Sequence, residues 1–266
     1  MDQDALRVDG LFLSRSGRTV LSGVSFALAP GSFCGLIGVN GSGKTTLIRA
    51  LLGLLPADAG GIEGAARGHR ALGYVPQKID ADPYMPLRAR DVVALGFDGH
   101  RYGLPLPSRR RRDRVAAMLA AVGADAFADR RLGDLSGGQQ QRIFIAHALV
   151  REPQLLLLDE PLANLDMPSI AGIVSVLKRI ARESGVTVLI SSHDVNPLVG
   201  ALDRVIYLAG GGAVSGRPDE VLRSGVLSRL YGHHIDVLRV HGRLVIVPAG
   251  ETHPIAPDEP HVERLE

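Results

Sequence analysis

The chain has 266 residues, of which 45% are hydrophobic, and this is enough for one large folded domain or for a core with a smaller lobe. Lysine and arginine number 30 against 28 aspartates and glutamates, and a net charge of +2 argues against nucleic acid as a dominant partner. The single cysteine, Cys34, excludes an intramolecular disulfide and is expected in a buried strand. No apolar run approaches the roughly 18 residues of a membrane span, which predicts a soluble, cytoplasmic chain.

The first predicted elements are two strands, at residues 6–13 and 20–28, separated by the polar segment SRSGRT. They predict an antiparallel start to the fold. FCGLIG at 33–38 predicts a third strand, which runs into a glycine-rich turn and then a helix over 45–55. This order of strand, loop and helix is the context in which a phosphate-binding loop has meaning.

A short strand at 72–75 precedes a segment of different character, residues 79–134. This segment is punctuated by proline and rich in arginine, and ARDVVALG and DRVAAMLAAVG have helical periodicity. We therefore predict an inserted helical lobe at about 79–134.

Strands and helices alternate in the second half of the chain. LLLLD (155–159), VTVLISS (186–192) and DRVIYLA (203–209) predict strands, with helical stretches near 168–183 and 194–201. Such alternation is typical of an α/β fold with a parallel sheet. HIDVLRV and RLVIV, joined by HG, predict a terminal hairpin, and the proline-rich segment after it is expected to be mobile.

Residues 38–46, GVNGSGKTT, fill every position of the phosphate-loop pattern G-x-x-x-x-G-K-[ST]. The glycines allow backbone N–H groups to converge on phosphate oxygens, Lys44 neutralises the β/γ charge, and the Thr45 hydroxyl can ligate Mg²⁺. The candidate ATP-binding residues in this loop are Gly38, Asn40, Gly41, Ser42, Gly43, Lys44, Thr45 and Thr46.

Polar side chains follow two of the predicted parallel strands, where ligands bind in such sheets. Asp159 and Glu160 come after LLLL; they could cap the strand, but beside a phosphate loop we favour Asp159 as a Mg²⁺ ligand and Glu160 as the residue that polarises the attacking water. His193 follows VTVLISS, and its imidazole can donate to a γ-phosphate oxygen.

The segment LSGGQQQRIFIAHAL, 135–149, predicts a helix whose free N-terminal N–H groups can hold a second anion. With this segment the motifs resemble, in order, those of the nucleotide-binding subunits of ATP-binding cassette (ABC) transporters: GVNGSGKTT, GYVPQ, LSGGQ, LLLLDE, LANLD and SSHD. The resemblance covers roughly residues 6–232. It implies an α/β fold with three parts: a RecA-like P-loop core with a mostly parallel sheet, an N-terminal antiparallel β subdomain and the inserted helical subdomain. These parts would form an ABC ATPase domain over 1–232, followed by a hairpin and tail at 233–266.

The resemblance also implies how the second anion site is used. In that family two copies pair head to tail, so that the signature of one copy covers the γ-phosphate on the phosphate loop of the other. Carried over to this chain, Gln77 contacts Mg²⁺ or the attacking water, and Asp166 communicates across the dimer. The residues implied to bind phosphate in trans are Ser136, Gly137 and Gly138, and Gln139 is a further candidate ATP-binding residue.

Two positions depart from the family pattern. Arg15 stands where an aromatic residue usually stacks on adenine, and its guanidinium can either stack on the base or point to solvent. His147 stands where the family often has arginine.

Within the family, MPLRARDVVALG and SRLYG are most similar to importers of divalent metal ions such as zinc and manganese. This implies an ATPase that uses ATP and Mg²⁺ and energises a separate membrane permease from the cytoplasmic face of the membrane. Its further, indirect partner would be an extracytoplasmic metal-binding protein, and nucleic acid is not expected as a partner. The basic run SRRRRDR, 108–114, is a solvated helix end by default, with anionic lipid headgroups as the alternative contact.

The main alternative is a soluble cassette ATPase without a transport role, such as an iron–sulfur cluster assembly ATPase. A DNA-repair ATPase would carry a long coiled coil between phosphate loop and signature, whereas Leu135 follows Lys44 by only 91 positions (135 − 44). A non-hydrolysing regulator is disfavoured because the hydrolysis residues are complete.

Overall fold

The structure, a computed structural model, describes residues 4–64, 72–77, 85–98, 108–248 and 262–264. The chain divides into two compact units: the first holds residues 1–6, 29–33 and 63–190, and the second holds residues 7–28, 34–62 and 191–266. Among the residues described, no helix is both long enough and apolar enough to span a bilayer.

Three parallel strands form the sheet section of the first unit, in the order β5 (Leu72–Val75), β6 (Leu155–Leu158) and β7 (Thr187–Ser192). All four leucines of β6 are buried, as expected for a strand with neighbours on both sides and both faces covered. Helix α5 (Met167–Ser184) connects β6 to β7 and ends at Gly185, which adopts the left-handed conformation common at helix ends.

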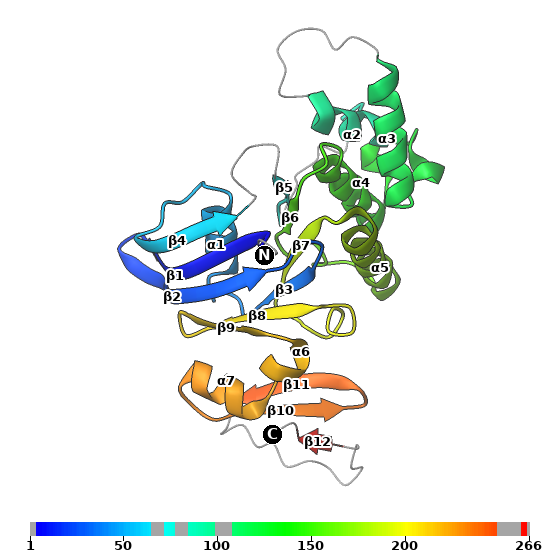
Figure 1. The fold of residues 1–266 in the computed structure, drawn as a ribbon. Helices are drawn as coiled ribbons and strands as arrows, with labels where there is room; N and C mark the ends of the chain where they lie inside the picture. Colours follow the sequence, from blue (N-terminus) through cyan, green and yellow to red (C-terminus); the bar gives the residue numbers. More distant parts are fainter. Residues whose placement is uncertain (1–3, 65–71, 78–84, 99–107, 249–261, 265–266) are drawn as a thin grey trace. The chain divides into compact units, whose positions relative to one another are not determined.

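The helical part of the first unit lies within and just after the predicted lobe. It contains α2 (Ala89–Asp98), α3 (Arg109–Ala121), the 3₁₀ turns η1 (Asp125–Phe127) and η2 (Leu132–Asp134), and α4 (Gly137–Leu149). Helix α2 packs on both α3 and α4 (Figure 1). Most of the described part of 79–134 is therefore helical, and the signature helix is confirmed as α4.

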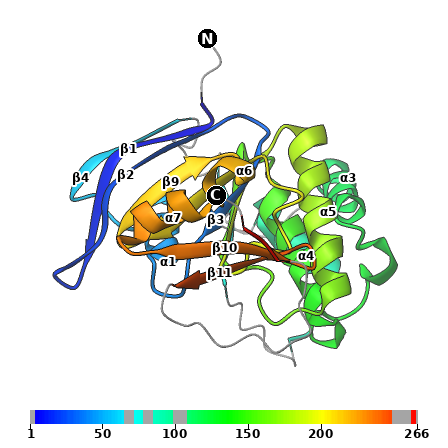
Figure 2. The ribbon, with the colours of Figure 1, turned by 90° about the horizontal axis from the view of Figure 1, so that it is seen from below.

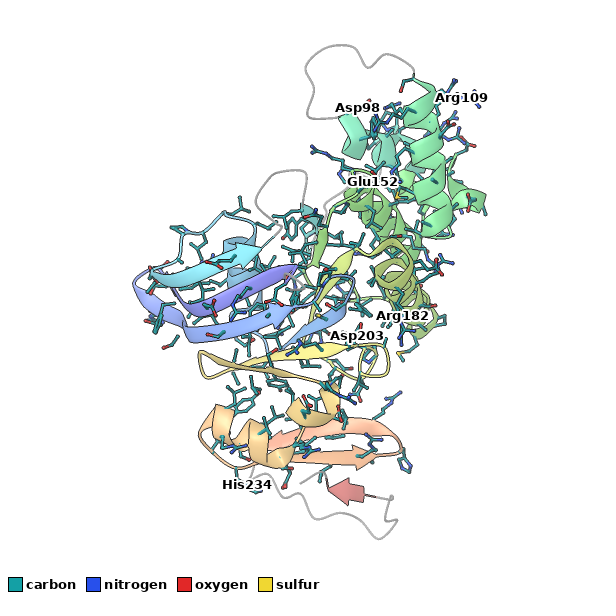
Figure 3. The ribbon with its side chains drawn as sticks, in the orientation of Figure 1. Asp98, Arg109, Glu152, Arg182, Asp203 and His234 are labelled. Carbon is teal, nitrogen blue, oxygen red and sulfur yellow. The ribbon has the colours of Figure 1, made fainter. Side chains whose placement is uncertain are left out.

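The basic run forms the first turns of α3. Ser108 caps this helix by accepting a hydrogen bond from the N–H of Arg111. Nε of Arg111 lies 2.7 Å from Oδ2 of Asp98 at the end of α2, a residue labelled in Figure 3. Nε of Arg114 donates to the carbonyl of Val150 at 3.1 Å. Two arginines of the basic run, Arg111 and Arg114, therefore hold α3 to other parts of this unit.

In the second unit β3 (Phe33–Ile37) pairs parallel with β8 (Arg204–Ala209), and β8 pairs antiparallel with β9 (Gly212–Gly216). Cys34 is buried in β3, as predicted. The pairs β5–β6, β6–β7 and β3–β8 are thus parallel and only β8–β9 of these four pairs is antiparallel, as expected for this α/β fold. Helix α1 (Lys44–Leu51) follows β3 after the phosphate loop.

A second sheet has the strand order β2-β1-β4, with β1 (Leu6–Arg15), β2 (Arg18–Leu28) and β4 (Ala59–Gly64). Ser16 and Gly17, both with positive φ, form the turn of the β1–β2 hairpin, which confirms the predicted start. The sequence did not predict β4 or β9.

The C-terminal part of the second unit contains α6 (Pro218–Val221), α7 (Ser224–Tyr231) and a sheet in the order β11-β10-β12. Strands β10 (Ile235–Val240) and β11 (Arg243–Pro248) form the predicted hairpin, with His241 and Gly242 at positive φ in its turn, and α7 packs on β10 (Figure 2). Strand β12 (Val262–Arg264) pairs with β10. This corrects the prediction of a mobile tail for those three residues, because β10 supplies backbone partners that the sequence did not reveal.

The helix predicted at 194–201 is wrong: the segment forms turns. The N–H of Asn196 donates to Oδ1 of Asp194 at 2.9 Å, and the N–H of Asp194 donates to Oγ of Ser192 at 3.1 Å. Such local side-chain bonds compete with helical ones and favour turns.

Candidate functional site

The phosphate loop has the backbone that its glycines predict. Gly41 and Gly43 have φ values of 82° and 102°, and Gly43 is the residue before α1. Lys44 is 5% exposed, and its Nζ donates to the carbonyls of Gly38 at 2.7 Å and Val39 at 3.2 Å. The lysine is therefore held across the loop, with its charge next to the start of a helix.

Two further features of the loop fit a phosphate ligand. A Cβ on Gly38 would lie 2.5 Å from Oγ of Ser42 and 2.6 Å from the carbonyl oxygen of Leu208, so only glycine fits there. Oγ of Ser42 is buried and has no hydrogen-bond partner among the residues that the structure describes. Leaving a buried hydroxyl unsatisfied costs about 1–3 kcal/mol, which a phosphate oxygen would recover. Thr45 is half-buried, Thr46 is buried and Asn40 is exposed.

The first unit brings two predicted catalytic residues together. Nε2 of Gln77 donates to Oε2 of Glu160 at 3.2 Å. Asp159, 1% exposed, is fixed by its backbone N–H, which donates to the carbonyl of Val75 at 2.9 Å. Glu160 has a φ of 44°, a conformation that costs about 1–3 kcal/mol outside glycine and is concentrated at functional sites.

His193 belongs to the second unit, directly after β7, and its side chain is exposed. The carbonyl of the preceding residue, Ser192, accepts a hydrogen bond from the N–H of Gly38 at 3.3 Å. Val39 and His193 also line the same hollow of about 500 Å³. The structure thus places His193 beside the phosphate loop, as its proposed chemistry requires.

The signature begins a capped helix. Oγ of Ser136 accepts from the N–H of Gln139, and Oε1 of Gln139 accepts from the N–H of Ser136, which is a capping box. Ser136 and Gly137 are exposed, whereas a Cβ on Gly138 would lie 2.4 Å from Oγ of Ser169 in α5. The two exposed residues leave the N-terminus of α4 accessible to an anion.

The remaining predicted positions have different surroundings. Arg15 is exposed at the end of β1. Asp166 precedes α5 without a capping bond from its side chain, and it is also exposed. Nδ1 of His147 lies 2.9 Å from the carbonyl oxygen of Val92, so this departure from the family pattern joins α4 to α2.

A model of the ABC transporter family matches residues 21–163, from β2 through the phosphate loop and signature to LLLLDE. The chain belongs to the ABC transporter family. It is therefore an ATP-binding cassette that hydrolyses ATP, and the family predicted from the motifs of its sequence is confirmed.

Three curated relatives of the cassette each carry the name zinc import ATP-binding protein ZnuC. The protein from Cereibacter sphaeroides is 42% identical over 220 residues, which cover 82% of this chain and 85% of the relative. The protein from Ruegeria pomeroyi is 37% identical, covering 87% and 86%. One from Pseudomonas fluorescens is 34% identical, covering 95% and 97%.

Solved structures agree with the cassette fold. One is a transporter described as of the metal-chelate type, in an inward-facing conformation, with a TM-score of 0.78, 27% identity and coverage of 94% of this chain and 99% of that chain. Another is cbiO1 from Clostridium perfringens, part of the ABC transporter complex cbiONQ, with a TM-score of 0.73, 29% identity and coverage of 85% and 94%.

The sequence motifs did not single out Asn196. Its side chain bonds to both backbone groups of Leu244 in β11. The only sequence signal is the short pattern of an aspartate and an asparagine two residues apart after SSH, which is typical of turns.

Proposed function

We propose that this chain is the ATP-hydrolysing subunit of an importer of divalent metal ions, zinc in the first place, and that it drives a separate membrane permease. The observation that carries the proposal is the 42% identity to a zinc import ATP-binding protein over 82% of the chain. Manganese remains the second candidate cargo. The relatives reported above give no support to a soluble iron–sulfur assembly ATPase.

The roles within the ATPase follow from the residues. Lys44 and the backbone of the phosphate loop would hold the phosphates, and Glu160 would polarise the attacking water while Gln77 holds its carboxylate. His193 would donate to the γ-phosphate. Thr45, Gln77 and Asp159 would hold Mg²⁺, which neutralises phosphate charge when bound.

Two copies would form two identical sites, each completed by the signature of the partner. The exposed Ser136 and Gly137 support this, because the structure leaves the N-terminus of α4 open to a ligand. We propose that the assembly lies at the cytoplasmic face of the membrane, with the permease between the cassettes and an extracytoplasmic metal-binding protein.

The helical part offers a surface for the permease. A hollow of about 400 Å³ lies among α2, α3 and η1. Its lining is apolar at Ala94, Val115, Ala116, Leu119 and Ala128, and charged at Arg90, Asp91, Arg111, Arg112 and Asp125. An apolar floor with a charged rim is suited to a short amphipathic helix.

Ala116→Glu is expected to abolish co-purification with the permease and to leave the ATPase of the isolated cassette within about twofold of wild type. Ala116 is exposed on α3 and lines the hollow, so a glutamate there fills the hollow without disturbing the helix. Ala117→Glu is the matched control, because Ala117 is the exposed neighbour that does not line the hollow. Pull-down from detergent-solubilised membranes measures both, and equal binding by the two variants would contradict this docking surface.

The cargo is tested in proteoliposomes that contain the cassette and the permease encoded beside it. ATP hydrolysis is expected to rise when the extracytoplasmic binding protein is added with zinc, and zinc-65 uptake is expected to follow. The same protein loaded with manganese gives the comparison. Stimulation of ATP hydrolysis by manganese alone would identify manganese as the cargo. A cassette that forms a complex only with soluble assembly proteins would contradict the importer proposal.

A further inference from the structure

Asn196 ties the turn after His193 to the C-terminal hairpin. Its Nδ2 donates to the carbonyl of Leu244 at 2.9 Å, and its Oδ1 accepts from the N–H of Leu244 at 2.7 Å. Both polar ends of the amide are therefore used on one residue of β11, in the way that a neighbouring strand would pair with it.

The same side chain is linked back to His193 through short local bonds. Oδ1 of Asp194 accepts from Nδ2 of Asn196 at 2.8 Å and from its N–H at 2.9 Å. Oγ of Ser192 donates to the carbonyl of Asp194 at 2.7 Å. The residues on both sides of His193 therefore form one hydrogen-bonded turn, and Asn196 is the member that reaches the hairpin.

The hairpin also forms part of the wall around His193. The hollow of about 500 Å³ that His193 and Val39 share is lined by Leu244, Val245 and Ile246 of β11. The His193 side chain is exposed on this hollow, and the backbone of the turn sets the point from which its ring projects.

The hairpin is anchored well enough to act as a support. The N–H groups of Val237 and Ile235, in β10, donate to Oγ of Ser224 and Ser228 in α7, each at 2.8 Å. The hydroxyls of Tyr207 and Tyr231 lie 3.3 Å apart and join β8 to the end of α7. Burial, with the Tyr231 hydroxyl, raises the pKa of the Tyr207 phenol above its ordinary value.

We propose that the C-terminal hairpin sets the position of His193 during hydrolysis through Asn196, which acts as a positioning residue and touches no phosphate. The proposal rests on the proposed role of His193 at the γ-phosphate. Because the phosphate loop has its own internal bonds, from Lys44 to Gly38 and Val39, the hairpin controls the rate of hydrolysis and leaves nucleotide affinity unchanged.

The test compares variants of the 266-residue chain. Asn196→Ala is expected to lower kcat for ATP by about 5- to 50-fold, because misplacing a reacting group by about 1 Å can cost about 100-fold. The KM for ATP and the Kd for a fluorescent ATP analogue are expected to stay within about twofold. Amide hydrogen exchange is expected to rise in residues 191–199 and 243–248, which are the two segments that Asn196 joins.

Two further variants make the comparison specific. Arg243→Ala changes an exposed residue next to Leu244 in β11 and is expected to hydrolyse ATP as wild type does. Asn196→Asp keeps an acceptor for the Leu244 N–H but loses the Nδ2 donor and places a second carboxylate beside Asp194. Its kcat is expected between those of wild type and Asn196→Ala, and it gives the same test if Asn196→Ala does not fold.

The outcomes distinguish the positioning role of Asn196 from the role of His193 at the γ-phosphate, on which it rests. Wild-type kcat in both Asn196 variants, with His193→Ala inactive, would overturn the positioning role and leave the role of His193 intact. Normal hydrolysis by His193→Ala would instead overturn the role of His193 itself. A weaker Kd with unchanged kcat would place Asn196 in nucleotide binding and would also overturn the proposal.

Discussion

Replacing Glu160 with glutamine is expected to lower kcat for ATP about 10²- to 10⁴-fold, with the Kd for ATP changed by less than about twofold. Glutamine has the size of glutamate but cannot take up or share a proton with the attacking water. The contact from Nε2 of Gln77 to Oε2 of Glu160, 3.2 Å long, survives because the amide oxygen also accepts. Single-turnover hydrolysis and ATP-analogue binding measure the two quantities.

The sequence offers a matched control for this substitution. Glu152 is also in the first unit and also has a positive φ, 56°, but its carboxylate forms an ion pair with Arg114 at 2.9 Å. Glu152→Gln is therefore expected to hydrolyse ATP normally. We also expect the Glu160 variant to remain a dimer on a sizing column with ATP, because bound nucleotide holds the two copies together. Near-normal ATP hydrolysis by Glu160→Gln would show that Glu160 does not polarise the attacking water.

The parts of the fold that the sequence predicts well are those where local pattern and tertiary environment agree. GVNGSGKTT follows a buried strand and begins a helix, and the positive φ of Gly41 and Gly43 is what those glycines allow. The four leucines before Asp159 form a fully buried strand. In both cases the residue type and the long-range contacts favour the same structure.

Strands β4 and β9 were missed because their sequences, AGGIEG and GAVSG, have low strand propensity. Their pairing partners decide the conformation. A Cβ on Gly60 would lie 2.2 Å from the carbonyl oxygen of Gly10, so glycine allows β4 to approach β1 closely. Such a close approach depends on residues far away in the chain, and periodicity within one segment cannot reveal it.

The site was predicted as a set of residues, but its conformations were not. The motifs identify Gln77 and Glu160, but not the positive φ of Glu160 or the direct bond between their side chains. A conformation that costs energy locally is maintained by surrounding structure, so local propensity predicts against it. The bonds from Asn196 to Leu244 were missed for a related reason, because they join residues 48 positions apart.

Exchanging Ser136 for aspartate is expected to abolish ATP hydrolysis, whereas exchange for asparagine keeps much of it. Serine, asparagine and aspartate cap helices about equally well, so both variants retain the capping bond to the Gln139 N–H and fold. Aspartate near a helix N-terminus also interacts favourably with the dipole. The two variants differ mainly in one negative charge, placed where the γ-phosphate of the partner's ATP is proposed to bind.

ATP binding to the phosphate loop is expected to remain within about twofold of wild type in both Ser136 variants, because Lys44 keeps its bonds to Gly38 and Val39. Steady-state hydrolysis and analogue binding measure the contrast, with thermal unfolding as the check on folding. Equal hydrolysis by the aspartate and asparagine variants would show that no phosphate approaches Ser136 during turnover.

Mixing two inactive variants tests whether the signature acts on the partner copy. Lys44→Ala removes the phosphate-loop charge, and Ser136→Asp blocks the signature. In a mixed pair one composite site carries both changes, while the other combines an intact loop with an intact signature. An equal mixture is expected to recover up to about a quarter of wild-type hydrolysis, because half of the pairs are mixed and each has one working site. If the signature instead acted on the phosphate loop of its own chain, no site in the mixture would have both an intact loop and an intact signature. The mixture would then recover no ATP hydrolysis.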